Sequence, residues 1–83
     1  MRLTVSQLGS YVQRSLQQDP LLRDLEVTGE ISNAKLYRGG MLFFSLKDEQ
    51  ASISCVMYAE YASELPAMPR DGMHAVARGS VTL

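Results

Sequence analysis

The stretch of residues 27–58 places the strongest constraint on the fold. It contains three segments in which apolar and polar residues alternate, separated by the pair Gly39-Gly40 and by residues 48–51. Alternation with a period of two is typical of strands that bury one face, and glycine pairs between such segments are typical of tight hairpins. The pattern therefore predicts three consecutive antiparallel strands, at residues 25–35, 41–47 and 52–58.

A helix is predicted before the first strand, at residues 4–18. Thr4 can cap its N-terminus, and Gln7 three positions later completes the spacing of a capping box. The helix is expected to end before Pro20, because the residue ahead of a proline is pushed out of helical dihedral angles. We expect the helix to pack on the strands through apolar residues that recur at helical spacing: Val5, Leu8, Val12 and Leu16.

The C-terminal part predicts a short helix at residues 59–65, ending before Pro66, and a fourth strand at residues 73–83. Gly29 and Gly79 each lie inside a predicted strand. A glycine there marks a bend, a bulge or a close approach of another backbone.

This order of elements is that of an OB-fold, a five-stranded Greek-key barrel, without its last strand. The fold class is therefore mainly β with an N-terminal helix: residues 3–20 form the helix packed on the barrel, and residues 21–83 form the truncated OB-fold. We expect the chain to be a fragment of a longer protein; the alternative is that residues 73–83 bend at Gly79 and supply two strands. The open edge predicts dimerisation or strand exchange.

Composition excludes several classes of function. With 46% hydrophobic and 20% charged residues among 83, the chain is globular and has no apolar run long enough to cross a membrane. A single cysteine, Cys55, gives no disulfide and favours a reducing cytoplasm. His74 has no partner at metal-ligand spacing, and the adjacent Asp48 and Glu49 are turn residues. We therefore expect no metal, no cofactor and no catalytic residue in this chain.

Charge is distributed unevenly. The net charge of −1 disfavours a nucleic-acid partner, yet residues 34–47 carry three cations and no acid, whereas residues 48–71 carry five acids against Arg70 alone. The positive charge is therefore local, and it lies in the stretch that predicts the sheet.

Strand alternation divides the second and third strands into a core face and an outward face. The outward residues include an aromatic, Phe43, which suits base stacking, and hydroxyls and cations that suit sugar and phosphate. Tyr37 lies between Lys35 and Arg38 at the predicted hairpin; the alternative for Phe43 is packing under that hairpin or under the helix. The predicted core face carries Leu42, Phe44, Leu46, Ile53, Cys55 and Met57. The candidate nucleic-acid-binding residues are Asn33, Lys35, Tyr37, Arg38, Phe43, Ser45, Lys47 and Ser54.

Four segments of the chain resemble the N-terminal domain of exodeoxyribonuclease VII large subunits: LTVSQLGSYV, DPLLRDLEVTGEISNAK, GGMLFFSLKDEQASISCVM and DGMHAVARGSVTL. The resemblance implies an OB-fold that binds single-stranded DNA, ahead of a catalytic domain and a helical region that recruits the small subunit. It implies that the whole enzyme degrades single-stranded DNA to oligonucleotides in DNA repair and turnover. The family's catalytic acids lie downstream, so this chain is expected to bind DNA without cutting it. Ser54 often has a basic counterpart in the family, and residues 59–61 lack the family's cations, so we expect weak affinity.

Two other functions fit the same sequence. The segment FSLKD also resembles the anticodon-binding OB domain of aminoacyl-tRNA synthetases, which predicts RNA in place of DNA. The acidic balance of the whole chain fits a protein-interaction module, whose outward face docks another domain.

Overall fold

The computed structural model describes residues 1–83 as two compact units, Met1–Val27 with Ala77–Leu83, and Thr28–Val76, the sheet unit. The strands form one four-stranded sheet in the order β3-β2-β1-β4, and the mainly β fold with an N-terminal helix is confirmed. None of the helices combines the length and the apolar character that crossing a membrane requires. The elements are α1 (Val5–Gln18), η1 (Pro20–Leu22), β1 (Leu25–Leu36), β2 (Leu42–Lys47), β3 (Ser52–Met57), α2 (Ala59–Ala62) and β4 (His74–Gly79).

Helix α1 begins where the capping box predicts. The backbone N–H of Gln7 donates to the hydroxyl of Thr4 at 3.1 Å, and the backbone N–H of Thr4 donates to Gln7 Oε1 at 2.9 Å. No residue of α1 is buried, so its packing on the barrel stays a prediction. Within the same unit, Gln13 Oε1 accepts the backbone N–H of Leu83 at 2.8 Å, which ties the C-terminal segment to the helix.

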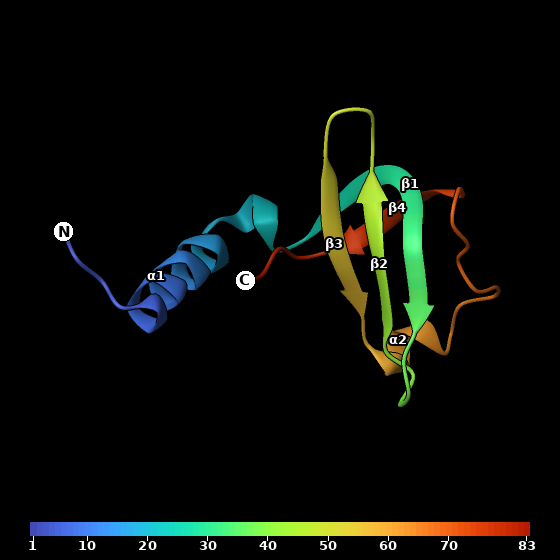
Figure 1. The fold of residues 1–83 in the computed structure, drawn as a ribbon, viewed down its shortest axis with the longest axis horizontal. Helices are drawn as coiled ribbons and strands as arrows, with labels where there is room; N and C mark the ends of the chain where they lie inside the picture. The colour runs from blue at the N-terminus through green and yellow to red at the C-terminus, as the bar shows by residue number, and fades with distance from the viewer. The chain divides into compact units, whose positions relative to one another are not determined.

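Both predicted hairpins of the sheet unit are confirmed. Gly39 and Gly40 have φ angles of +93° and +92°, which residues with a Cβ rarely adopt, and they close the turn between β1 and β2. In the turn between β2 and β3, Asp48 Oδ1 accepts the backbone N–H groups of Gln50 and Ala51 at 2.8 and 2.9 Å. Figure 1 shows the glycine hairpin and α2 at one end of the sheet and the Asp48 turn at the opposite end.

The predicted faces of β2 are confirmed. Its burial alternates along the strand, with Leu42, Phe44 and Leu46 buried. β3 pairs with β2 in the predicted register, but Ile53 is 47% exposed although its partner Leu46 is buried. β3 is an edge strand of the sheet, so nothing in this unit covers Ile53 from its open side. The core comprises Ile31, Leu42, Phe44, Leu46 and Ala62.

Gly29 and Gly79, both predicted to lie inside strands, occupy different positions in the structure. A Cβ on Gly29 would lie 3.1 Å from the Lys47 carbonyl oxygen and 3.3 Å from its nitrogen, so Gly29 marks a close approach of two backbones. The prediction that Gly79 lies inside a strand is wrong, and so is the alternative that residues 73–83 bend there, because β4 ends at Gly79 and residues 80–83 form no strand. Residues 73–83 therefore supply one strand and not two.

Candidate nucleic-acid interface

The sheet unit presents one solvent-exposed face opposite its core, which we call the exposed face. In antiparallel pairs, directly opposite residues point to the same side, so the register sorts this face into rows that run across β1, β2 and β3. Successive rows are about 7 Å apart, because a strand rises about 3.4 Å per residue. The three rows are Lys35–Phe43–Val56, Ser32–Ser45–Ser54 and Glu30–Lys47–Ser52.

An aromatic pair occupies the hairpin end of this face. Phe43 is 41% exposed and Tyr37 is 52% exposed. Their ring centroids are 4.9 Å apart with an interplanar angle of 79°, an edge-to-face contact of the kind that aromatic rings prefer. Phe43 therefore packs in part against the hairpin, and it still offers part of its ring to a ligand.

Sequence reasoning missed a third aromatic, Tyr58. Its backbone is extended, with φ −68° and ψ 153°, and it follows Val56 by two residues, so strand alternation continues onto the exposed face. Tyr58 is 57% exposed. The signal was present in the sequence, because the predicted third strand ran to residue 58 with Ser52, Ser54 and Val56 outward.

The candidate cations differ in their electrostatic surroundings. Lys35, on β1, and Arg38, in the hairpin, are exposed and take no part in the ion pair of the sheet unit. Lys47 does: its Nζ lies 3.4 Å from Glu30 Oε2 on the neighbouring strand. The charge available to phosphate is therefore concentrated at the hairpin end.

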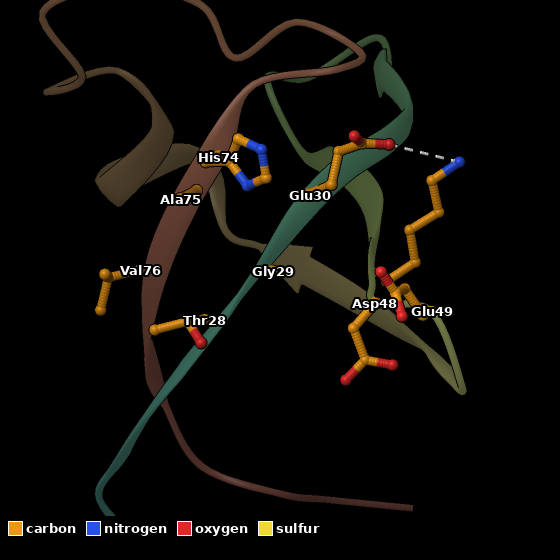
Figure 2. A pocket seen from close by; sticks show the side chains of 9 residues that line it. Thr28, Gly29, Glu30, Asp48, Glu49, His74, Ala75 and Val76 are labelled. Atoms are coloured by element: carbon orange, nitrogen blue, oxygen red, sulfur yellow. Dashed lines mark ion pairs between the residues drawn. The ribbon is translucent and has the colours of Figure 1, made fainter.

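The opposite end of the exposed face holds an open groove of about 760 Å³ over β4, β1 and the Asp48 turn. Figure 2 shows the carboxylate of Glu30 directed at the Lys47 ammonium, with Asp48 and Glu49 on the turn below it. Three carboxylates against one ammonium make this groove unfavourable for phosphate. Hydrogen bonds from the backbone N–H groups of Gln50 and Ala51 lower the pKa of Asp48 and keep it ionised.

The titratable side chains of the chain do not form a metal-binding cluster. No three His, Cys, Asp or Glu side chains converge where they could hold a metal ion, and His74 is exposed on β4 at the edge of the groove. Burial raises the pKa of the Cys55 thiol, which keeps it protonated and weakly nucleophilic at neutral pH.

The remaining candidate residues are placed as follows. Ser45 is half-buried and Ser54 is exposed, and the two lie opposite each other in the middle row. Asn33 is exposed, but it lies where the register of β1 shifts, with a φ of +54°. The positive φ by itself accounts for an asparagine at this position, independently of any contact between its side chain and a ligand.

Comparison with known proteins identifies the family. Residues 3–83 match the family model of OB-fold nucleic acid binding domains. The chain belongs to this family. This OB-fold domain is 47% identical, over 98% of its length, to the exodeoxyribonuclease 7 large subunits of Geobacillus kaustophilus (strain HTA426) and Clostridium botulinum (strain Hall). It is 38% identical over the same share to that of Alkaliphilus metalliredigens (strain QYMF). The domain spans only 18% of the Geobacillus protein and 20% of the other two.

Proposed function

We propose that this OB-fold domain binds single-stranded DNA on its exposed face, as the DNA-binding part of an exodeoxyribonuclease VII large subunit. The whole protein would hydrolyse single-stranded DNA to oligonucleotides in DNA repair and turnover in the cytoplasm, with the small subunit binding outside this domain. The family match and the relatives' names support the nucleic-acid and nuclease parts of this proposal.

One observation carries the choice of site: the row Lys35–Phe43–Val56, with Tyr37 packed edge-on against Phe43. A base stacks on Phe43 while Lys35 contacts the adjacent phosphate. Arg38 lies in the same hairpin and contacts a second phosphate. The cation and the aromatic that a nucleotide requires are thus direct neighbours.

The neighbouring row extends the site. Ser45 and Ser54 offer hydroxyls about 7 Å further along the sheet, and Tyr58 offers a second ring beyond the Phe43 row. A row spacing of about 7 Å exceeds the 3.4 Å per nucleotide of a stacked duplex strand. We therefore expect an extended strand with its bases separated, and a duplex does not fit.

Fluorescence anisotropy with labelled oligo-dT, oligo-rU and duplex DNA tests this function. Counterion release contributes a slope of about −0.7 in log K against log salt for each phosphate contacted by a single strand, so two available cations predict about −1.4. Lys35→Ala and Arg38→Ala should each flatten the slope by about 0.7. Arg14→Ala removes the same charge from the exposed surface of α1 and controls for net charge alone.

The outcomes separate the competing functions. Tighter binding of oligo-dT than of duplex, with the expected slope, supports the proposal. A clear preference for oligo-rU supports the RNA-reading alternative, because only RNA offers the 2′-hydroxyl. No binding of any probe at low salt contradicts a nucleic-acid role and favours a protein-interaction module.

The nuclease and assembly parts need separate tests. A longer protein that includes the downstream domains should release oligonucleotides from single-stranded DNA, and the 83-residue chain should not. β3 and β4 are the edge strands of the sheet and can pair with a second copy. A monomeric sedimentation profile across the micromolar range would contradict dimerisation.

A further inference from the structure

Strand β1 contains one residue more than its pairing with β2 requires. Ser32 pairs with Ser45 and Lys35 pairs with Phe43, so a step of three residues on β1 faces a step of two on β2. The register shift lies between Ser32 and Lys35, and Asn33 within it has a φ of +54°. This is a β-bulge, which reverses the side of the sheet to which the following residues point.

The bulge decides where Lys35 lies. Without it, regular pairing from Ser32 onward would set Ala34 opposite Phe43 and Lys35 opposite Leu42, on the core face. With it, Lys35 is opposite Phe43 on the exposed face, and Leu36 is opposite Leu42. Leu36, which holds the position opposite Leu42, is 55% exposed, so an apolar residue takes the core-side position at this end of β1 and the bulge sets the cation beside the aromatic.

Residues 71–73 hold the bulge from the other edge of β1. Asp71 Oδ1 accepts the backbone N–H of Ala34 at 2.9 Å, which is the first N–H after the extra residue. The backbone N–H of Gly72 donates to the Ile31 carbonyl at 2.8 Å, and the N–H of Ile31 donates to the Met73 carbonyl at 2.7 Å. The backbone on both sides of Asn33 is thus hydrogen-bonded to the segment 71–73.

We propose that Asp71 and Asn33 are positioning residues, which place Lys35 on the exposed face by fixing this bulge. Asp71 acts as the acceptor for the N–H of Ala34. Asn33 acts through its positive φ, which asparagine tolerates better than most residues, and not through contact of its side chain with DNA. The effect on binding rests on the proposed function, whereas the placement of Lys35 does not.

Two pairs of variants test this role. Asp71→Asn keeps an oxygen acceptor, and Asp71→Ala removes it. Asn33→Gly keeps access to positive φ without a side chain, and Asn33→Val disfavours that φ because valine is β-branched. Each variant is measured by oligo-dT anisotropy against salt, by circular dichroism, and by proton NMR for contacts between the Lys35 and Phe43 side chains.

Asp71→Asn and Asn33→Gly should keep the wild-type slope and the Lys35–Phe43 contacts. Asp71→Ala and Asn33→Val should stay folded and lose the contacts between the Lys35 and Phe43 side chains. Each should also flatten the salt slope by about 0.7, the value for one phosphate contact. If Asp71→Ala does not fold, the Asn33 pair decides.

Retention of the Lys35–Phe43 contacts in folded Asp71→Ala and Asn33→Val would overturn the proposal. A loss of affinity in Asn33→Gly as large as in Asn33→Val would overturn the role of Asn33, because its side chain would then contact DNA. Wild-type protein that keeps the NMR contacts but binds no oligo-dT refutes the proposed function and leaves the placement of Lys35 established.

Discussion

Phe43→Ala is the substitution that most directly tests the exposed face. The ring of Phe43 lies on the middle strand of the β1–β2–β3 meander, between Lys35 on one side and Val56 on the other. Truncation removes the flat surface on which a base would stack, and it also removes the ring against which Tyr37 packs. Because the side chain points away from the core, we expect a large effect on binding and a small one on stability.

The size of the effect follows from the exposed area. A phenylalanine presents about 200 Å² of surface, and Phe43 is 41% exposed, so a base can cover about 80 Å². At about 25 cal/mol per Å² this corresponds to about 2 kcal/mol, inside the range of about 1–3 kcal/mol for base–aromatic stacking. One factor of ten corresponds to about 1.4 kcal/mol, so Kd for oligo-dT should rise about 30-fold.

Oligo-dT anisotropy at fixed low salt measures Kd, and thermal melting followed by circular dichroism measures stability. Phe43→Leu keeps an apolar side chain without a flat ring, so its Kd relative to that of Phe43→Ala separates the contribution of ring stacking from that of apolar burial. Phe44→Ala is the matched control on the core face: Phe44 is 8% exposed, and its truncation should cost about 3–5 kcal/mol of stability. If folded Phe43→Ala binds within threefold of wild type, stacking on this ring is refuted.

Three further predictions concern stability and reactivity. Gly29→Ala should destabilise the fold by about 1–3 kcal/mol in urea titrations, because its Cβ would meet the backbone of Lys47 at 3.1 Å, whereas Gly79→Ala, with no atom within 4 Å, should be near neutral. The pKa of Asp48 is lowered in the folded state, so the unfolded state binds more protons and the free energy of unfolding should fall as pH drops below about 3.8. Asp48→Asn should reduce this dependence on acid. Equal acid unfolding curves for the two proteins would contradict the prediction. Cys55 should react with a thiol reagent at neutral pH more slowly than an unstructured cysteine peptide, because burial raises its pKa; equal rates would show that the strand opens freely.

Much of this fold could be predicted because its signals are local. The capping box at Thr4, the glycine hairpin and the alternation of β2 each depend on residues a few positions apart, and each is confirmed. The face of Phe43 follows from that alternation. The exposure of Ile53 did not, because it depends on which strand lies at the edge of the sheet, a property of the topology.

The β-bulge at Asn33 could not be predicted from local sequence patterns either, because it also depends on residues distant in the sequence. Asn33 departs from regular strand geometry within β1, where Ala34 and Ile31 find hydrogen-bond partners in residues 71–73, far along the chain. Alternation carried through β1 from Ile31 would assign Lys35 to the core face. The candidate role of Lys35 was inferred from its charge, and the geometry that makes it available is set by Asp71.

The distribution of charge in space differs from that along the sequence. Residues 34–47 contain three cations and no acid, but β1 brings Glu30, just outside this window, to within 3.4 Å of Lys47. The pair Glu30–Lys47 is nearly neutral, and Asp48 and Glu49 lie beside it. Phosphate is therefore attracted to Lys35 and Arg38 at the hairpin end of the sheet and repelled by the carboxylates at the opposite end. We therefore expect a strand bound on this face to be held at the hairpin end by charge and stacking together. Because Lys47 is paired with Glu30, only Lys35 and Arg38 are available to phosphate. The expected salt slope is therefore about −1.4, and a third available cation would make it steeper.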